Sequence, residues 1–311
     1  MSIDFSRVTE MSDKYGVITQ LELGGRVIWQ LPSGGKVVLQ VEKITSDTYA
    51  GETTYTGEEF ILLDIYPKTN GAVKVTYGGL TKTITDTSGA EEPNAQQVYF
   101  GTFNGVSDSV TTPASGELVI DGDFYAFGCG SFKTGSKDTN VGYFGGITTV
   151  SDFGSMTDIA AYTFRNCDKL VCQELPEGIT TIGDYAFAMK ATTSNYGSSS
   201  INSLSIKTAM LDGEITLPST IKSIGSYAFA SPSAVAYSSG ATADRYPGYL
   251  SKVKILATTP PTLGELSFGG SRWTTDGKYT YTTIEVLKGC GDTYKVADGW
   301  SNCAGQITEA E

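Results

Sequence analysis

Leu-Pro-Glu-Gly-Ile-Thr-Thr-Ile-Gly-Asp-Tyr-Ala-Phe-Ala at residues 175–188 is followed by Leu-Pro-Ser-Thr-Ile-Lys-Ser-Ile-Gly-Ser-Tyr-Ala-Phe-Ala at residues 217–230. Nine of the fourteen aligned pairs are identical. An earlier partial copy places Phe164 23 residues before Phe187, and Phe229 follows Phe187 by 42 residues, which is one such period plus an insertion of 19. A period near 23 lies in the range of leucine-rich repeats and excludes short-period β-helices and the longer helical repeats.

The residue types of this repeat predict one coil of a solenoid. Ile and Leu point inward, Pro ends a strand, Gly turns the chain, and the Ala-Phe pair fills the space beneath the next coil. A single copy cannot bury its own Phe, so the copies must stack. The predicted repeat core consists of Phe164, Leu175, Ile179, Ile182, Phe187, Leu217, Ile221, Ile224 and Phe229.

The pattern Leu-Pro-x-x-Ile-x-x-Ile-Gly-x-Tyr-Ala-Phe resembles the BspA-like leucine-rich repeats of bacterial surface proteins. In that family a Cys follows shortly after the Phe, as Cys167 follows Phe164, but Ala-Met and Ala-Ser follow Phe187 and Phe229. The stack is therefore expected to be less regular than the family norm. Residues 257–268 and 294–307 resemble the last coil and the closing helix, so the resemblance spans residues 147–311. It implies a scaffold for binding and specifies no activity.

The N-terminal half predicts a different β architecture. Residues 1–35 form an attachment segment with a hairpin around Gly24-Gly25, and residues 36–125 hold short strand-like runs that favour an immunoglobulin-like β-sandwich. These runs are 36–44, 59–66, 72–77, 80–85, 97–103 and 117–120. Residues 126–146 form a Gly-rich junction. The whole chain is thus expected to be mainly β, with the repeats and a C-terminal capping helix in residues 147–311. The N-terminal half also loosely resembles uncharacterised gut-phage and prophage proteins.

Composition removes several classes of function. The chain has no histidine, which excludes Ser-His-Asp triads, Cys-His pairs and His-based zinc sites. A net charge of −12 with no Lys or Arg run argues against nucleic acid as a partner. No apolar run approaches the roughly 20 residues of a membrane-spanning helix, and the first residues lack the basic and apolar regions of a secretory signal. We expect the protein on a virion surface or outside the cell, so either its export does not use an ordinary signal or the signal was removed.

Cysteines and carboxylates suggest no cofactor and no metal. The five cysteines show no C-x-x-C spacing, so buried thiols are expected, and a bridge between Cys290 and Cys303 is left open. Asp121 and Asp123 offer two carboxylates to a calcium ion, but Asp-Gly at a strand end is ordinary turn chemistry. No carboxylate pair stands out as the machinery of a glycoside hydrolase.

Two insertions rich in Ser, Gly, Thr and Tyr interrupt the repeat register at residues 189–214 and 231–250. Insertions in a solenoid emerge as loops on one face, and exposed aromatic residues among small polar ones are typical of binding loops. The alternative, that the tyrosines cover the repeat core, is left open. The candidate ligand-binding residues are Tyr196, Tyr237, Tyr246 and Tyr249, with Trp273, Tyr279 and Tyr281 in a later excursion.

These features favour a non-enzymatic structural or recognition protein of a phage or prophage virion, either a tail appendage or a head decoration. Its N-terminal half would contact other proteins of the assembly, and its repeats would bind a glycan or protein on a host surface. Self-association is left open. The alternatives are a secreted bacterial adhesin and, with less support, a carboxylate-dependent carbohydrate-active enzyme.

Overall fold

The structure is a computed structural model of the chain. It describes residues 11–13, 16–18, 20–23, 26–30, 35–45, 57–67, 72–85, 96–103, 105–128, 146–165, 167, 169–189, 191–193, 204–206, 213–230, 250–269, 272–273 and 279–311. Within these ranges the chain is mainly β, as the sequence predicted.

The leading segment contains two antiparallel hairpins. β1 (Met11–Asp13) pairs with β2 (Gly16–Ile18), and β3 (Gln20–Leu23) pairs with β4 (Arg26–Gln30). The second hairpin is the one expected from the sequence. Its first arm begins at Gln20, and Val17 before it pairs with Ser12 of β1.

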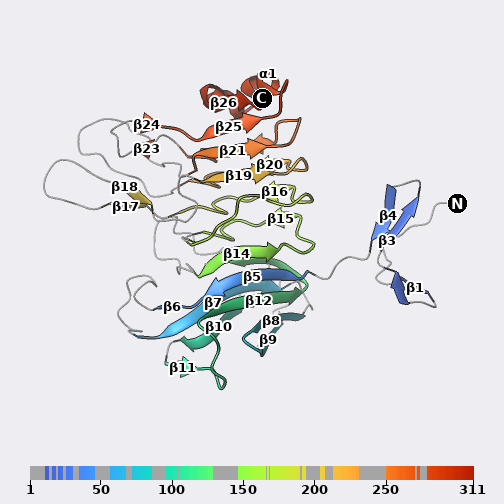
Figure 1. The fold of residues 1–311 in the computed structure, drawn as a ribbon, viewed down its shortest axis with the longest axis vertical. Helices are drawn as coiled ribbons and strands as arrows, with labels where there is room; N and C mark the ends of the chain where they lie inside the picture. The colour runs from blue at the N-terminus through green and yellow to red at the C-terminus, as the bar shows by residue number, and fades with distance from the viewer. Residues whose placement is uncertain are drawn as a thin grey trace, which may run out of the picture.

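Two antiparallel sheets of five strands each follow (Figure 1). One has the order β11-β10-β7-β13, with β6 also paired to β7, and the other has the order β14-β5-β12-β8-β9. Their strands are β5 (Val37–Glu42), β6 (Ile44–Thr45), β7 (Glu59–Pro67), β8 (Ala72–Tyr77), β9 (Leu80–Thr85), β10 (Gln96–Phe103), β11 (Val106–Ser107), β12 (Ser115–Gly122), β13 (Phe124–Gly128) and β14 (Ile147–Asp152). The immunoglobulin-like detail of the expectation is not confirmed by this strand order.

The inner faces of the two sheets share one hydrophobic core. β8 alternates buried Val73, Val75 and Tyr77 with more exposed neighbours, which is the pattern of a strand with one face buried. The Tyr77 ring of β8 meets the Phe100 ring of β10 edge to face at 5.7 Å, so the sheets pack face to face. Gly78 and Gly79 both have positive φ, 58° and 81°, and close the tight turn into β9.

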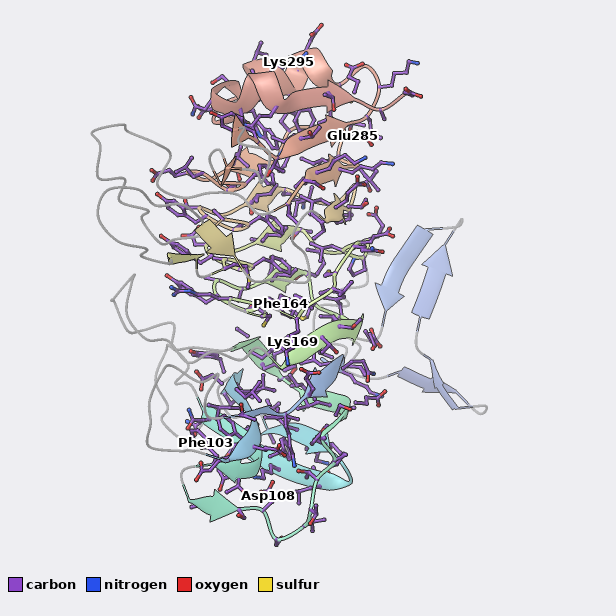
Figure 2. The ribbon with its side chains drawn as sticks, turned by 60° about the vertical axis from the view of Figure 1, so that its left-hand side comes forward. Phe103, Asp108, Phe164, Lys169, Glu285 and Lys295 are labelled. Carbon is purple, nitrogen blue, oxygen red and sulfur yellow. The ribbon has the colours of Figure 1, made fainter. Side chains whose placement is uncertain are left out.

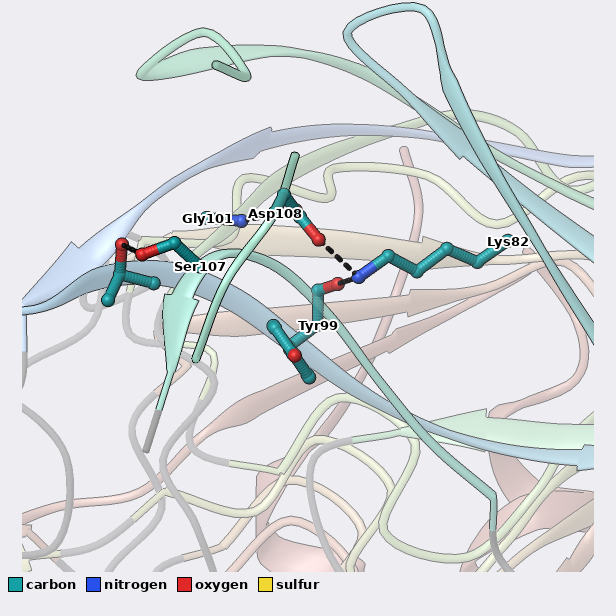
Figure 3. A network of polar contacts seen from close by, with 6 residues as sticks. Lys82, Tyr99, Gly101, Ser107 and Asp108 are labelled. Carbon is teal, nitrogen blue, oxygen red and sulfur yellow. Dashed lines mark hydrogen bonds and ion pairs between the residues drawn. The ribbon is translucent and has the colours of Figure 1, made fainter. Parts of the chain in front are cut away.

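A partly buried ion pair connects the two sheets (Figure 3). Lys82 of β9 crosses to the other sheet, where its Nζ lies 2.6 Å from Oδ1 of Asp108 and also donates to the Tyr99 carbonyl. Asp108 Oδ2 accepts the Gly101 amide at 2.8 Å, and its side chain is only 7% exposed. The Lys82 ammonium also lies 4.1 Å from the centre of the Tyr99 ring. Removing Lys82 alone would leave the largely buried Asp108 side chain without its cation, which is expected to destabilise the fold.

The repeats form a solenoid with two parallel sheets. One has the order β15-β16-β20-β22 and the other β19-β21-β25-β26. Their strands are β15 (Asp158–Ile159), β16 (Thr181–Ile182), β20 (Ser223–Ile224), β22 (Thr262–Leu263), β19 (Glu214–Leu217), β21 (Lys252–Ile255), β25 (Thr283–Val286) and β26 (Ile307–Glu309). Two hairpins leave the solenoid, β17 (Ala191–Thr193) with β18 (Leu204–Ile206) and β23 (Arg272–Trp273) with β24 (Tyr279–Thr280).

The glycine of each Ile-Gly or Leu-Gly step lets the coils approach closely. A Cβ added at Gly183 would lie 2.4 Å from the backbone nitrogen of Ala161 in the preceding coil. The matched glycines, Gly225 and Gly264, would clash with the preceding backbone at 2.5 Å and 2.3 Å. The repeat therefore needs glycine at this position because no side chain fits between successive coils.

The nine residues assigned to the repeat core are all buried, with exposures between 0% and 3%. Their aromatic members belong to a longer stack, called here the aromatic spine, which comprises Phe127, Phe164, Phe187, Phe229, Phe268 and Trp300. Successive ring centres are 5.7, 5.1, 5.0, 6.0 and 6.1 Å apart. The spine starts in β13 of the sandwich and ends in the C-terminal cap.

The cap consists of α1 (Gly291–Val296) and the 3-10 helix η3 (Trp300–Gln306), followed by β26. Its two large aromatic residues are fully buried and each donates a hydrogen bond to the coil below. The Tyr294 hydroxyl donates to the Ala257 carbonyl at 2.8 Å, and Nε1 of Trp300 donates to the Pro261 carbonyl at 2.7 Å. These bonds satisfy the polar atoms that burial would otherwise leave unpaired.

The solenoid continues directly from the sandwich (Figure 1). β14 pairs with β5, so the first strand after the predicted junction completes a sandwich sheet. Thr148 of β14 then accepts the Val171 amide of the first coil at 2.9 Å. Lys169 of that coil forms an ion pair with Glu42 of β5, and Figure 2 shows Lys169 and Phe164 just above the sandwich. Together with the Phe127–Phe164 contact, these interactions join the two regions through one core.

Candidate functional site

Three partly exposed tyrosines, Tyr162, Tyr185 and Tyr227, form a stacked row on the solenoid. They occupy the same place in successive coils and share an unusual backbone, with φ of 65°, 57° and 56°. Ring centres are 5.2 Å and 5.1 Å apart with nearly parallel planes. The guanidinium of Arg165 lies 5.4 Å from the Tyr162 ring centre. We call these three residues the tyrosine row.

Hydrogen bonds between coils hold this strained backbone. The Tyr162 amide donates to the Asp184 carbonyl at 3.1 Å, and the Tyr185 amide donates to the Ser226 carbonyl at 2.9 Å. The Tyr227 amide repeats the bond to the Glu265 carbonyl at 2.9 Å. Positive φ in a non-glycine residue persists only where its surroundings fix it. The stacking of the coils therefore fixes the spacing of the rings.

The tyrosine row ends at a cavity. In the next coil Leu266 takes the matched position, with φ of 46°, and a half-open hollow of about 660 Å³ lies beside it. The hollow, called here the end cavity, lies between the last coil and the cap. Its described lining consists of Leu263, Gly264, Glu265, Leu266, Ser267, Phe268, Gly269, Tyr281, Gly299, Asn302, Cys303 and Gln306.

The lining of the end cavity is both apolar and polar. Tyr281 is half exposed, at 50%, and the Glu265 and Asn302 side chains are also exposed to solvent. The Ser267 hydroxyl already donates to the Gly264 carbonyl at 3.0 Å, and the Cys303 thiol donates to the Trp300 carbonyl at 3.3 Å. Burial raises the pKa of Cys303 to about 11, so this thiol is neutral near pH 7 and is a poor nucleophile.

The seven ligand-binding candidates from the sequence fall into three groups. Tyr196, Tyr237, Tyr246 and Tyr249 lie outside the described residues. Trp273 and Tyr279 face each other in the pairing of β23 with β24, of which only the backbone is described. Tyr281, two residues after Tyr279, is exposed and lines the end cavity.

The described residues give no sign of a metal centre or of a redox pair. They contain no group of three or more Cys, Asp or Glu side chains placed to hold a metal ion. Cys290 and Cys303 form no disulfide, so the bridge left open above is absent, and Cys167 and Cys172 form none either. Burial raises the pKa of Cys172 to about 12. Asp64, whose pKa burial raises to about 6, belongs to β7 of the sandwich and does not line the end cavity.

Sequence reasoning missed most of this site. The recurrence of tyrosine in Ile-Gly-x-Tyr-Ala-Phe was a signal for the row, because a fixed place in every coil predicts a line of equivalent side chains. No comparable signal marks Glu265, Asn302 and Gln306, which come together only through the folding of the cap onto the last coil.

Residues 143–237 match the family described as BspA type Leucine rich repeat region, in six copies. The repeat segment therefore contains BspA-type leucine-rich repeats, as its sequence pattern indicated. No curated protein and no solved structure matches the chain. Among the described residues, no helix combines the length and apolar character needed to cross a membrane. Repeats of this family are typical of surface or adhesion-type proteins, are generally non-enzymatic and commonly mediate protein binding.

Proposed function

We propose that this chain is a non-enzymatic recognition protein that displays its repeats on a surface and binds a ligand of a host cell with them. The observation that carries the proposal is the tyrosine row ending in the end cavity. Stacked, partly exposed aromatic rings with fixed spacing offer a large contact area that loses little entropy on binding. A neighbouring hollow with polar and apolar walls adds the means to select a ligand.

The two ends of the molecule suit two different tasks. The sandwich and the leading segment would attach the chain to other proteins of an assembly, while the coils of the tyrosine row and the cap would carry the recognition surface. The aromatic spine connects the sandwich to the cap through a continuous core, and the ion pair between Lys169 and Glu42 adds a surface contact between the sandwich and the first coil. A rigid connection favours this division, because it holds the binding surface at a constant distance from the point of attachment.

More specifically, we propose that the protein is a component of a phage or prophage virion, either a tail appendage or a head decoration. A modular β architecture that ends in a binding solenoid fits such a component. The alternative is a bacterial adhesin that exposes the same surface. Immunodetection of the chain in gradient-purified particles and in bacterial envelope and medium fractions separates the two. Recovery with the particles supports the virion form, and recovery only in the envelope or medium supports the adhesin.

Binding of the purified full chain to intact candidate host cells tests the general proposal. We expect saturable retention that unlabelled chain displaces. Replacing Tyr196, Tyr237, Tyr246 and Tyr249 together with Ser tests whether the inserted loops add contacts, and we expect retention to fall while the melting temperature stays nearly unchanged. Retention that does not saturate on any host or envelope tested would contradict a recognition function.

A further inference from the structure

We infer that the end cavity is a binding site for an uncharged saccharide, which it holds without cleaving. This inference rests on the proposed function and specifies its ligand class. The cavity, at about 660 Å³, lies within the usual range of small-molecule sites, roughly 300–1,000 Å³. Two parts of the chain form it, the turn after β22 and the cap, with Tyr281 completing the wall.

The walls offer what a sugar ring requires. A pyranose has a face of C–H groups and a rim of hydroxyls that both donate and accept hydrogen bonds. The half-exposed Tyr281 ring, with Leu266 nearby, provides an apolar surface for such a face. The amides of Asn302 and Gln306 can donate and accept, and the Glu265 carboxylate accepts strongly from hydroxyls.

The charge of the walls selects against other small ligands. None of the described lining residues is Lys or Arg, whereas Glu265 contributes a negative charge. Phosphate, sulfate and carboxylate ligands would therefore meet repulsion with no compensating cation. A purely apolar ligand would cover Glu265, Asn302 and Gln306 without replacing the hydrogen bonds they make to water, which is unfavourable. A neutral polyol with one apolar face avoids both costs.

The residues that line the end cavity also favour binding of a saccharide over its hydrolysis. Glycoside hydrolysis commonly requires two carboxyl groups on opposite sides of the scissile bond. Glu265 is the only carboxylate among the described lining residues, and the Cys303 thiol is protonated near pH 7. The wall is also held rigidly, because Leu266 has a left-handed backbone while the Glu265 carbonyl accepts the Tyr227 amide at 2.9 Å. A rigid wall favours recognition of one ring shape.

The position of the end cavity extends this inference to longer glycans. Tyr227, the last ring of the tyrosine row, belongs to the coil next to Leu266. A chain anchored by one sugar in the cavity can run from there along the partly exposed rings. We therefore expect an oligosaccharide to bind more tightly than its terminal monosaccharide.

The test uses the full chain. A panel of neutral, amino, sulfated and sialylated glycans is screened first, and the best neutral hit is titrated by calorimetry against three variants. Tyr281→Ala removes the apolar platform and is expected to weaken binding at least tenfold. Glu265→Gln keeps the shape and removes the charge, and is expected to weaken binding about tenfold. Glu174→Gln, the same change at an exposed carboxylate of an earlier coil, should have no effect.

Because Tyr281 and Glu265 are exposed, both variants should retain the parent's melting temperature, and Glu265→Gln remains informative if Tyr281→Ala does not fold. The inference is overturned if no neutral glycan binds at millimolar concentration, if anionic glycans bind better, or if Glu174→Gln weakens binding as much as Glu265→Gln. Saturable retention of the chain on cells together with any of these results would refute the saccharide site and leave the proposed function standing.

Discussion

Replacing Phe187 with Ala should cost more stability than removing a partly exposed ring of the same coil, because Phe187 lies inside the aromatic spine. It is 1% exposed and stacks between Phe164 at 5.1 Å and Phe229 at 5.0 Å. Truncating a buried Phe to Ala typically costs about 3–5 kcal/mol, and the loss is larger where the site cannot collapse.

Here the site has little freedom to collapse. The Phe164 amide donates to the Ala186 carbonyl at 2.7 Å, and the Phe187 amide donates to the Ala228 carbonyl at 2.8 Å, so the backbone fixes the spacing of the coils. We therefore expect Phe187→Ala to lower the free energy of unfolding by about 4–5 kcal/mol, near the top of that range. The measurement is urea unfolding followed by far-UV circular dichroism, with the free energy taken from the midpoint and the slope.

Two control variants identify the cause. Phe187→Leu refills much of the volume and should cost about 1.5 kcal/mol or slightly more, since swaps that nearly conserve volume are tolerated best. Tyr185→Ala removes a stacked ring that is partly exposed, so it leaves no closed cavity and should cost about 1–2 kcal/mol. A loss for Phe187→Ala no greater than that for Tyr185→Ala would refute the argument that the spine is the stabilising core of the solenoid.

Three further predictions concern ionisable groups. Burial raises the pKa of Asp64 from 3.8 to about 6, so the folded protein loses stability as pH rises through 6. In urea unfolding, the free energy of unfolding of Asp64→Asn should match that of the parent below pH 4. At pH 7.5 it should exceed the parent's by at most about 3 kcal/mol. The Gly289 and Gly291 amides donate to the Glu309 carboxylate at 3.0 Å and 2.7 Å and lower the pKa of Glu309. The stability that Glu309 contributes should therefore be present above pH 4.5 and be lost as pH falls through its folded pKa. The melting temperatures of the parent and Glu309→Gln should converge only in acid. Burial raises the pKa of Cys172 to about 12, so iodoacetamide at pH 8 should modify it only after urea is added, and rapid labelling of the native chain, located by mass spectrometry, would contradict the buried position.

The repeats were predictable because their information is local and recurrent. Matching Phe187 to Phe229 in the alignment already assigned both rings to equivalent places, and the structure stacks them at an interplanar angle of 8°. Close packing of coils then leaves one orientation for the inward Ile and Leu residues. The deviation from the family's Cys pattern did not interrupt the spine, because Phe and not Cys supplies the contact between coils.

The junction between the sandwich and the repeats was harder to predict, because it depends on contacts between residues far apart in the sequence. Residues 147–152 read as the start of the repeats, yet β14 pairs with β5, more than a hundred residues earlier in the chain. Such pairing depends on sheet edges that local alternation does not identify. The link between Lys169 and Glu42 is equally non-local, because an exposed Lys or Glu has many candidate partners in a sequence and one in the fold.

The end cavity exists because the repeat stops there. In the regular coils, the rings of the tyrosine row stack on one another with centres 5.2 Å and 5.1 Å apart. Leu266 breaks the row with a shorter side chain, and the chain then turns through Gly299, with φ of 78°, to bring η3 over the last coil. The spine continues across this break, since Trp300 takes the place of the next Phe, at 6.1 Å from Phe268. The cap thus closes the core while the surface beside it stays open, and this difference between a continued interior and an interrupted exterior forms the end cavity, which we propose as the saccharide site.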